Sequence, residues 1–162
     1  MAELKKFISL NPSFRMALLP LDVEGSAPRA ASMAASATSL AGVGPMAAIP
    51  GALADLAVER MQGIGCAVSL VEYGGEISAM SDRPILVAIY AGRSPVSGRF
   101  GFLLERGDFP IGIATSSATV SQALNFGEAD AAVVVSASAT MADAAAKRVC
   151  NAVRGDDVRS SV

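Results

Sequence analysis

Residues 111–151 read IGIATSSATVSQALNFGEADAAVVVSASATMADAAAKRVCN and predict a strand, a polar loop, a second strand and a helix in close succession. The first strand covers residues 111–114 and is followed at once by hydroxyl side chains, at Thr115, Ser116, Ser117 and Thr119. The second strand covers residues 131–135, an apolar β-branched run that is typical of a strand buried on both faces. Hydroxyl groups, a buried strand and a helix therefore fall close enough together to form a binding site.

The helix that ends this stretch covers residues 139–151 and carries opposite charges on one face. Ser138 occupies the N-cap position, where its hydroxyl accepts a hydrogen bond from a free N–H of the first turn. The alanines that follow are strong helix formers. Asp143 and Lys147 are four residues apart, so their side chains lie on the same face of the helix.

The rest of the chain combines helical segments with short strands. Helical spacing predicts helices over residues 2–10, 28–40 and 51–62. Apolar runs between turns predict strands over residues 66–72, 77–80, 85–91 and 99–104. A chain of 162 residues is long enough for one domain with its own core. We therefore expect a single α+β domain over residues 1–162, with an antiparallel or mixed sheet of about five to seven strands and helices packed on its faces.

Composition and charge exclude several classes of function. The 13 basic residues are spread along a chain of net charge −2, whereas a nucleic-acid interface needs a basic stripe. The longest weakly polar stretch, residues 41–54, contains Pro45 and Pro50 and is shorter than the ~20 apolar residues of a membrane span. The N-terminal residues lack the apolar region of a secretory signal. We expect a cytoplasmic protein that binds neither nucleic acid nor membrane.

Composition also limits the metal sites and the thiol chemistry that this chain can have. The chain has no histidine and two cysteines, Cys66 and Cys150, far apart in the sequence. Zinc sites built from Cys and His, and catalytic triads that use an imidazole, are thereby excluded. We expect both cysteines to be buried thiols, Cys66 at the start of a mostly buried strand and Cys150 at the end of a helix. A disulfide is the alternative, although nothing indicates an oxidising compartment.

Two glycine-rich turns are candidate ligand contacts. Gly44 lies in the loop GVGPM, residues 42–46, before a helix whose free N–H groups are suited to an anion. A plain turn between two helices explains the same residues. Gly74 and Gly75 separate two strands and allow a two-residue hairpin, because both tolerate positive φ. That hairpin is the simpler explanation, and backbone contacts to a ligand are the alternative.

The four hydroxyl residues after the first strand are candidates for phosphate binding. A strand that ends in small hydroxyl residues leaves N–H and O–H groups directed into the space beyond it, which suits a phosphate. We therefore expect these residues to line a pocket. The alternative is that Ser117 or Thr119 caps a short helix that ends near Leu124.

Five short motifs, in one order, resemble those of a known family. They are AGVGPMAA at residues 41–48, YGGEI at 73–77, IYAGRSP at 89–95 with SG at 97–98, TSS at 115–117 and ADAAA at 142–146. Together they resemble the ApbE-like flavin transferases, which attach FMN from FAD to a protein threonine using magnesium. They are more similar still to an uncharacterised prokaryotic family that is related to these transferases. The resemblance extends from about Asn11 onward.

This resemblance implies an ApbE-like fold and a small-molecule ligand, with FAD or FMN and Mg²⁺ as cofactors. It makes Asp143 the metal ligand, and a single carboxylate suffices because Mg²⁺ takes one or two carboxylates beside phosphate and water. In the turn YGGE, Tyr73 and Glu76 replace an Asn and an Asp of the transferases, so the glycine backbone contacts are those expected to remain. The residues assigned to the ligand are Gly44, Gly74, Gly75, Thr115, Ser116, Ser117, Thr119 and Lys147.

The chain departs from the transferase pattern at three places. Pro50 stands where the transferases carry a lysine, and Lys147 stands where a threonine oxygen joins the aspartate in holding the metal. No histidine-containing loop precedes the final strand, and Gln122 lies near the position where the closer family often has histidine. Two classes of function stay open. One is a Mg²⁺-dependent enzyme acting on a flavin or related nucleotide; the other is a non-catalytic ligand-binding or structural relative.

A lysine at position 147 affects whether the site can bind a metal ion. A protonated ammonium group has no lone pair for a cation, and it reaches a carboxylate one turn away. If Lys147 points inward, it pairs with Asp143 and substitutes for Mg²⁺. The alternative is a solvated side chain beside Arg148, near the carboxyl end of the helix where cations are favoured. The inward arrangement predicts weak Mg²⁺ binding that Lys147→Thr would strengthen.

In the resembled families, further residues precede the part that matches this chain and supply strands of the sheet. We therefore expect the chain to lack an N-terminal portion of the family domain, either because its start is misassigned or because it is a reduced form of the domain. Without those strands an apolar sheet edge would be exposed, and such an edge favours association. The expected state is a homo-oligomer.

Overall fold

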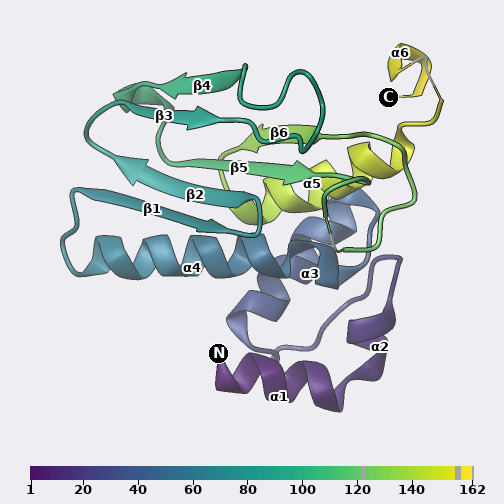
Figure 1. The fold of residues 1–162 in the computed structure, drawn as a ribbon. Helices are drawn as coiled ribbons and strands as arrows, with labels where there is room; N and C mark the ends of the chain where they lie inside the picture. The colour runs from purple at the N-terminus through teal and green to yellow at the C-terminus, as the bar shows by residue number, and fades with distance from the viewer. Residues whose placement is uncertain (122, 156–157, 162) are drawn as a thin grey trace.

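The computed structural model describes residues 1–121, 123–155 and 158–161. Gln122, which was singled out above, lies outside the described residues. A four-stranded sheet lies at the centre, with helices packed on one face and a two-stranded hairpin on the other (Figure 1). The expected α+β domain with helices on an antiparallel sheet is confirmed.

The helices begin and end close to the expected positions. Their bounds are α1 Ala2–Leu10, α2 Pro12–Met16, α3 Arg29–Ala41, η1 Pro45–Ala48, α4 Ile49–Gly63, η2 Arg106–Asp108, α5 Ala139–Ala152 and α6 Val158–Ser161. Ser138 caps α5 as expected, because its Oγ accepts a hydrogen bond from the Met141 N–H at 3.2 Å. Local capping and alanine content are therefore sufficient to place this helix.

The strands divide into two sheets. Their bounds are β1 Val68–Tyr73, β2 Glu76–Ser81, β3 Ile85–Ala88, β4 Gly101–Leu104, β5 Ile111–Ser116 and β6 Ala132–Ser136. The central sheet has the order β1-β2-β5-β6, whereas β3 pairs only with β4. All these pairings are antiparallel. The one larger sheet expected from the sequence is wrong, because the hairpin packs over the face of the central sheet instead of joining its edge.

The two faces of the central sheet are distinguished by alternation along β5. Ile111 and Ile113 belong to an apolar cluster with Val87 and Leu104 of the hairpin. Gly112 faces α5, where an added Cβ would lie 2.1 Å from the Ala139 nitrogen. Successive side chains of a strand point to opposite faces. The same alternation places Ile77 of β2 on the hairpin side, and its neighbours Glu76 and Ser78 on the helix side.

α4 and α5 cross closely near their N-terminal ends and cap one another. An added Cβ on Gly51 would lie 2.4 Å from the Ala139 carbonyl oxygen, so only glycine allows this approach. Asp143 Oδ2 accepts a hydrogen bond from the Gly51 N–H at 3.0 Å. In return, Asp55 of α4 accepts hydrogen bonds from the N–H groups of Ala139 and Thr140, both at 2.9 Å. Free N–H groups at each helix start are thus satisfied by a carboxylate of the other helix.

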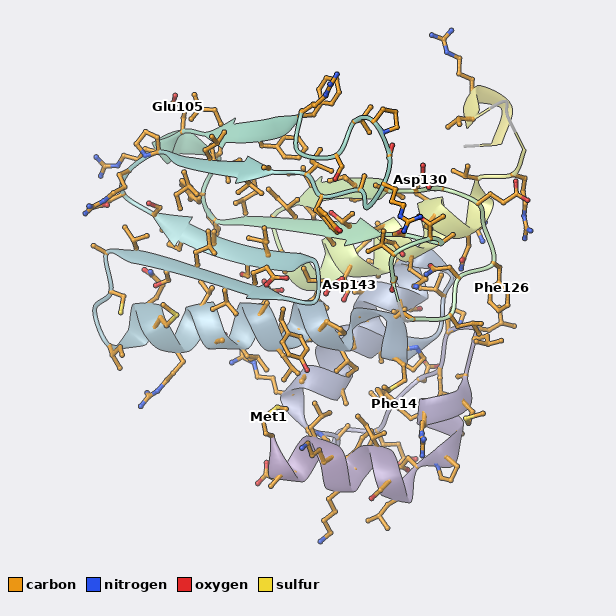
Figure 2. All side chains as sticks on the ribbon, viewed as in Figure 1. Met1, Phe14, Glu105, Phe126, Asp130 and Asp143 are labelled. Atoms are coloured by element: carbon orange, nitrogen blue, oxygen red, sulfur yellow. The ribbon has the colours of Figure 1, made fainter. Side chains whose placement is uncertain are left out.

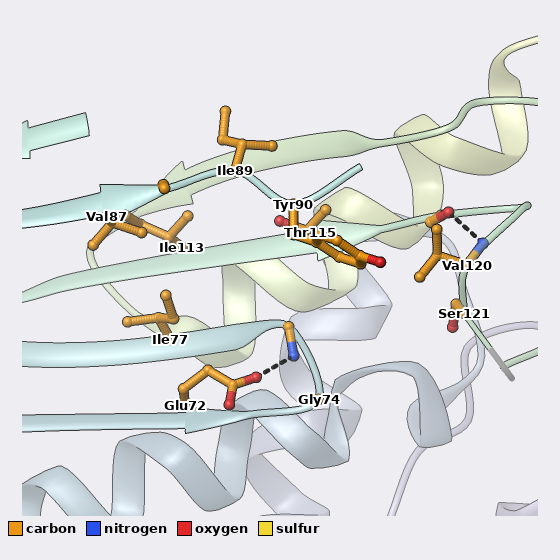
Figure 3. Close-up of a pocket in the computed structure, with 13 residues that line it drawn as sticks. Glu72, Gly74, Ile77, Val87, Ile89, Tyr90, Ile113, Thr115, Val120 and Ser121 are labelled. Carbon is orange, nitrogen blue, oxygen red and sulfur yellow. Dashed lines mark hydrogen bonds between the residues drawn. The ribbon is translucent and has the colours of Figure 1, made fainter. Parts of the chain in front are cut away.

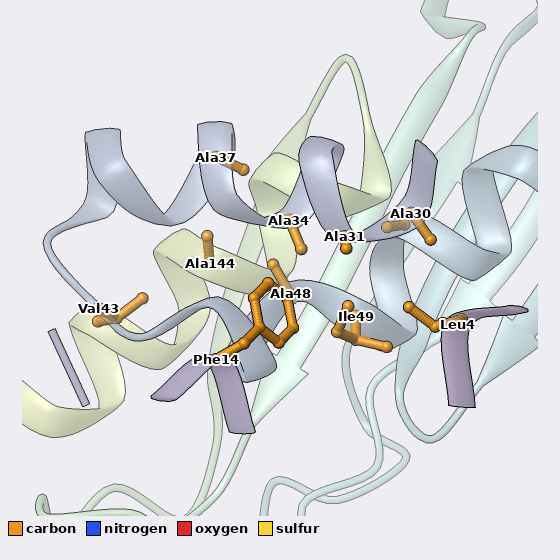
Figure 4. Packing of buried hydrophobic residues seen from close by; sticks show 11 residues of the cluster. Leu4, Phe14, Ala30, Ala31, Ala34, Ala37, Val43, Ala48, Ile49 and Ala144 are labelled. Carbon is orange, nitrogen blue, oxygen red and sulfur yellow. The ribbon is translucent and has the colours of Figure 1, made fainter. Parts of the chain in front are cut away.

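The helical part of the core is built from small side chains around Phe14. Its ring packs edge-on against Phe7, with 5.2 Å between the ring centroids. Buried alanines of α3 and η1, among them Ala34 and Ala48, surround the ring (Figure 4). Among the described residues, no single helix has the length and apolar character of a membrane span, and α3 with the segment Pro45–Gly63 does so only as a pair bent by 108°.

Both edge strands of the central sheet are less buried than expected. In β1 only Ser69 is buried, so the prediction of a mostly buried strand is wrong. In β6 Ala132 is buried but Val135 is 45% exposed, so the prediction of burial on both faces is also wrong. Cys66 precedes β1 and is half-buried, whereas Cys150 is buried as expected. Both thiols are free.

Candidate functional site

The turn Gly74–Gly75 lies beside the last residues of β5 at one end of the central sheet. Glu76 pairs with Ala114 across β2 and β5, and the Thr115 N–H donates to the Gly75 carbonyl at 3.1 Å. Gly74 and Gly75 have φ values of 78° and 109°, which glycine adopts far more readily than residues with a side chain. The two-residue hairpin expected from the sequence is confirmed.

A cavity of about 430 Å³ opens at this end of the sheet, on the side of the β3–β4 hairpin (Figure 3). Much of its wall is aliphatic and includes Ile77, Val87 and Ile113. Its polar and glycine lining consists of Glu72, Gly74, Gly75, Tyr90, Thr115, Ser117 and Ser121. An apolar wall with a few convergent polar groups is typical of a small-molecule site.

The four hydroxyl residues of the expected phosphate loop do not share one environment. Thr115 and Ser117 line the cavity. Ser116 is buried and donates to Asn125 Oδ1 at 3.1 Å, while the exposed Thr119 hydroxyl donates to Asp130 Oδ1 at 3.0 Å. The pocket therefore includes two of the four residues, because alternation along β5 turns Ser116 away from it. The described residues 117–121 and 123–131 contain no helix, so the helix-cap alternative is wrong.

Two buried carboxylates, Glu76 and Asp143, lie on the helix side of the sheet; Figure 2 shows Asp143 inside the molecule. Only 8% and 6% of their surfaces are exposed. Burial, reinforced by the charge of Asp143, raises the pKa of Glu76 to about 8. Burial also raises the pKa of Asp143 to about 7, against the opposing effect of the Gly51 hydrogen bond. Two acids that disfavour each other's ionisation titrate as a pair.

The acid pair and the cavity are joined through the glycine turn. Gly74 and Gly75 line the cavity and directly precede Glu76. Glu76 Oε2 lies 3.2 Å from the position that a Cβ on Gly74 would take, so the carboxylate reaches back over the turn. A ligand held against this turn would therefore lie near the acid pair.

Lys147 is held by the loop before β6 and does not bind Asp143. Its Nζ donates to Asn125 Oδ1 at 2.7 Å and to the Leu124 carbonyl at 3.1 Å. Burial lowers the pKa of the ammonium group, and its charge lowers the pKa values of both Glu76 and Asp143. The first alternative, an inward ion pair with Asp143, is wrong because Lys147 donates to acceptors of the loop instead. The solvated alternative is also wrong, because the side chain is half-buried.

Lys147 and Gly44 line a second cavity, of about 300 Å³, between the N-terminal segment and the loop before β6. An added Cβ on Gly44 would lie 1.8 Å from the Ala17 carbonyl oxygen. Glycine is therefore required at position 44 for close packing of two chain segments. The structure thus brings together Gly74, Gly75, Thr115 and Ser117, but separates them from Gly44 and Lys147.

Glu76 is the site residue to which sequence reasoning assigned no role. The available signal was its place at the start of a strand, directly after a glycine pair. Ser78 two residues later is also polar, and residues i and i+2 of a strand share a face. Two polar residues on the face that packs against helices indicate a buried polar contact on that face. The structure shows such a contact, because Ser78 Oγ donates a hydrogen bond to Asp55 at 2.7 Å.

The chemistry of the acid pair is compatible with Mg²⁺. The described residues contain no cluster of three or more Asp, Glu, Cys or His side chains that could hold a metal. Mg²⁺ needs no such cluster, because one or two carboxylates with waters and ligand phosphate complete its shell. Glu76 and Asp143 provide two oxygen donors whose ionisation a cation would favour. These two residues could therefore hold a magnesium ion.

The fold and the site are those of an α+β protein with a partly apolar cavity beside a buried acid pair. A family model described as "AbpE bacteria" matches residues 1–161, and the chain belongs to this family.

Relatives of the chain carry the name UPF0280 protein. That of Methanoculleus marisnigri is 46% identical over 155 residues, which cover 96% of this chain and 63% of the relative. That of Methanocella arvoryzae is 42% identical over 93% of this chain and 61% of its own length. UPF0280 protein MJ1526 of Methanocaldococcus jannaschii is 39% identical over 96% and 63%. The chain therefore spans less than two thirds of the length of these relatives.

Proposed function

We propose that this protein binds a phosphate-bearing ligand of the flavin nucleotide class, FAD or FMN, together with Mg²⁺. The observation that carries the proposal is that Glu76, one of the two buried acids, reaches back over the glycine turn that lines the cavity of about 430 Å³. The resemblance of five motifs of this chain to those of the ApbE-like flavin transferases supports the proposal, and the name of the matching family is compatible with it.

The cavity offers a different environment to each part of such a ligand. Its aliphatic wall, with Ile77 and Ile113, and the Tyr90 side chain suit a planar ring. The hydroxyl groups of Thr115 and Ser117 suit phosphate oxygens, because hydroxyl groups donate hydrogen bonds to them. The ring would lie between the sheet and the hairpin, with the phosphate toward the glycine turn.

Glu76 and Asp143 would hold the metal near this phosphate. A bound Mg²⁺ would supply charge neutralisation and polarise a phosphoryl oxygen. The N–H of Gly51 orients Asp143 and so prepares one acid of the pair for a cation.

Transfer of FMN from FAD to a protein hydroxyl is the reaction that fits a Mg²⁺-dependent member of this class: the new phosphate ester bond replaces the pyrophosphate bond of FAD, AMP leaves, and the hydroxyl proton is released. A binding protein without catalysis is the second candidate, and the position of Lys147 favours it. The ammonium group of Lys147 already offsets part of the charge of Glu76 and Asp143, and this lowers the affinity of the two acids for Mg²⁺.

An absorption spectrum and mass spectrum of the purified protein test the binding of flavin. We expect retained flavin, or quenching of FMN fluorescence on titration with Mg²⁺ present. Thr115→Val should weaken FMN binding about tenfold, as expected for loss of a hydrogen bond to a charged group. Thr119→Val is the matched control, because Thr119 lies outside the cavity. Colourless protein that fails to bind FAD or FMN with Mg²⁺ would contradict the proposal.

A further inference from the structure

The second cavity lies on the other side of the loop before β6, between that loop, α2, η1 and α5. Its volume of about 300 Å³ falls at the lower end of the range for small-molecule sites. Phe126, at the periphery of the molecule in Figure 2, forms part of its wall. The proposed flavin site uses none of its lining residues to contact the ligand.

The ionisable side chains that line this second cavity are positively charged. Arg15 and Lys147 are its ionisable lining residues, and no Asp or Glu lines it. Within the described part of the chain, the Arg15 guanidinium makes no hydrogen bond or ion pair. Lys147 uses two hydrogen bonds for the loop, and an ammonium group has three donors. Both cations therefore retain donors for an anion.

Most of the remaining lining is apolar, and part of it is open to solvent. Met16 is 72% exposed, Leu18 is 58% exposed and Leu124 is 62% exposed. These side chains come from two chain segments that meet at the cavity mouth. An apolar body placed there would remove this surface from water, which is favourable.

We propose that this cavity binds a small organic anion with an apolar body, such as a medium-chain carboxylate or an alkyl phosphate. Charge complementarity with Arg15 and Lys147 selects the anionic group. The apolar wall binds the body of the ligand. The inference is independent of the proposed flavin site, because it needs neither Mg²⁺ nor the first cavity.

A pair of fluorescent probes tests this proposal. Anilinonaphthalene sulfonate and N-phenylnaphthylamine share an apolar body, and only the first carries an anion. We expect saturable binding of the sulfonate, about tenfold tighter than binding of the neutral probe. Arg15→Met should reduce this difference severalfold, because only Lys147 then attracts the anion, and its fold should be intact because the guanidinium has no partner among the described residues. Lys5→Met, an exposed lysine on α1, is the matched control.

The location of the probe is checked by nuclear magnetic resonance of methionine methyl groups. Met16 and Met46 line the second cavity, whereas no methionine lines the first. We expect the sulfonate to shift the signals of Met16 and Met46 and to leave Met80 of β2 unchanged. Octanoate or octyl phosphate should displace the probe, octanol should not, and comparison of the two anions identifies the preferred group.

Three results would overturn the inference. They are equal affinity for the charged and neutral probes, an Arg15→Met variant that prefers the sulfonate as strongly as the wild type does, and shifts that spare both Met16 and Met46. Thr115→Val and removal of Mg²⁺ should leave probe binding unchanged. A result that contradicts flavin binding would therefore be distinguished from one that contradicts anion binding in the second cavity.

Discussion

Glu76 and Asp143 are acids that the fold holds where ionisation is costly. Each is nearly excluded from water, and the charge of Asp143 adds to the effect of burial on Glu76. Glu72 raises the pKa of Glu76 slightly further, whereas Lys147 lowers it. The pKa of about 8 for Glu76 and of about 7 for Asp143 stand well above the ordinary values of 4.5 and 3.8.

Without a bound metal, the free energy of unfolding should fall as the pH rises from about 4 to about 8. In this window the folded state holds protons that the unfolded state has released, so each rise in pH favours unfolding. Urea unfolding at several pH values with a chelator present measures the effect. Glu76→Gln should flatten this dependence, while Asp22→Asn, on an exposed aspartate, should not. Equal slopes for wild type and Glu76→Gln would refute the assignment.

Gly75 is a residue whose backbone conformation strongly favours glycine. Its φ of 109° is one that L side chains rarely adopt, and an added Cβ would lie 3.3 Å from the Thr115 carbonyl oxygen. Gly75→Ala should therefore lower the free energy of unfolding by roughly 1–3 kcal/mol. Gly63→Ala, in α4 with no atom near the added Cβ, should be neutral or stabilising. Thermal or urea unfolding of both variants compares them directly, and equal stability would contradict the strain.

At the scale of elements, the crossing of α4 and α5 depends on Asp55. Besides two backbone N–H groups, its carboxylate accepts hydrogen bonds from Thr140 Oγ1 at 2.6 Å and Ser78 Oγ at 2.7 Å. One side chain thus joins α4, α5 and β2. The same crossing positions Asp143, through its bond with Gly51.

Asp55→Ala should lower the free energy of unfolding by roughly 1.5–3 kcal/mol, because buried donors lose a charged acceptor. Chemical denaturation measures this loss, and Asp22→Ala provides an exposed aspartate as the control. The variant should also weaken ligand binding at the acid pair, since Asp143 shares the crossing. A loss equal to that of the control would show that Asp55 does not hold the helices together.

Elements with local signals could be predicted from the sequence, whereas their burial could not. The Ser138 cap and the glycine pair define α5 and the β1–β2 turn within a few residues of chain. Burial of β1 and β6 depends on which strand lies beside each of them. Both are edges of the sheet, and an apolar run such as residues 131–135 is compatible with an edge or a centre.

The candidate site, likewise, could be predicted only in part from the sequence. The family resemblance indicated Gly74, Gly75, Thr115 and Asp143, but not that the hydroxyl groups and the acid lie on opposite faces of the sheet and approach each other at the glycine turn. Lys147 was placed on the correct helix face, yet its partner Asn125 lies 22 residues away in the sequence. Contacts across such distances follow from packing and carry no local signal.

At the scale of the whole molecule, the outer face of the β3–β4 hairpin exposes paired leucines. Leu86 and Leu103 are cross-strand partners and are 73% and 64% exposed. We propose that this face contributes to a homo-oligomer, since exposed apolar side chains on a hairpin with free edges favour association.

Light scattering should then give a mass above the 16.4 kDa of one chain. Leu86→Lys should shift the protein toward the monomer, because a buried lysine at an interface is costly. Leu40→Lys is the matched control, because Leu40 is 80% exposed on α3. A monomeric wild-type protein at high concentration would contradict this prediction.

Calorimetric titration of FMN with and without Mg²⁺ tests whether Glu76 and Asp143 hold a cation for a phosphate-bearing ligand. We expect binding that requires Mg²⁺, approaches one equivalent, and weakens about tenfold or more in Asp143→Asn and Glu76→Gln but not in Asp22→Asn. FMN binding that is independent of Mg²⁺, or unaffected by Asp143→Asn and Glu76→Gln, would contradict it.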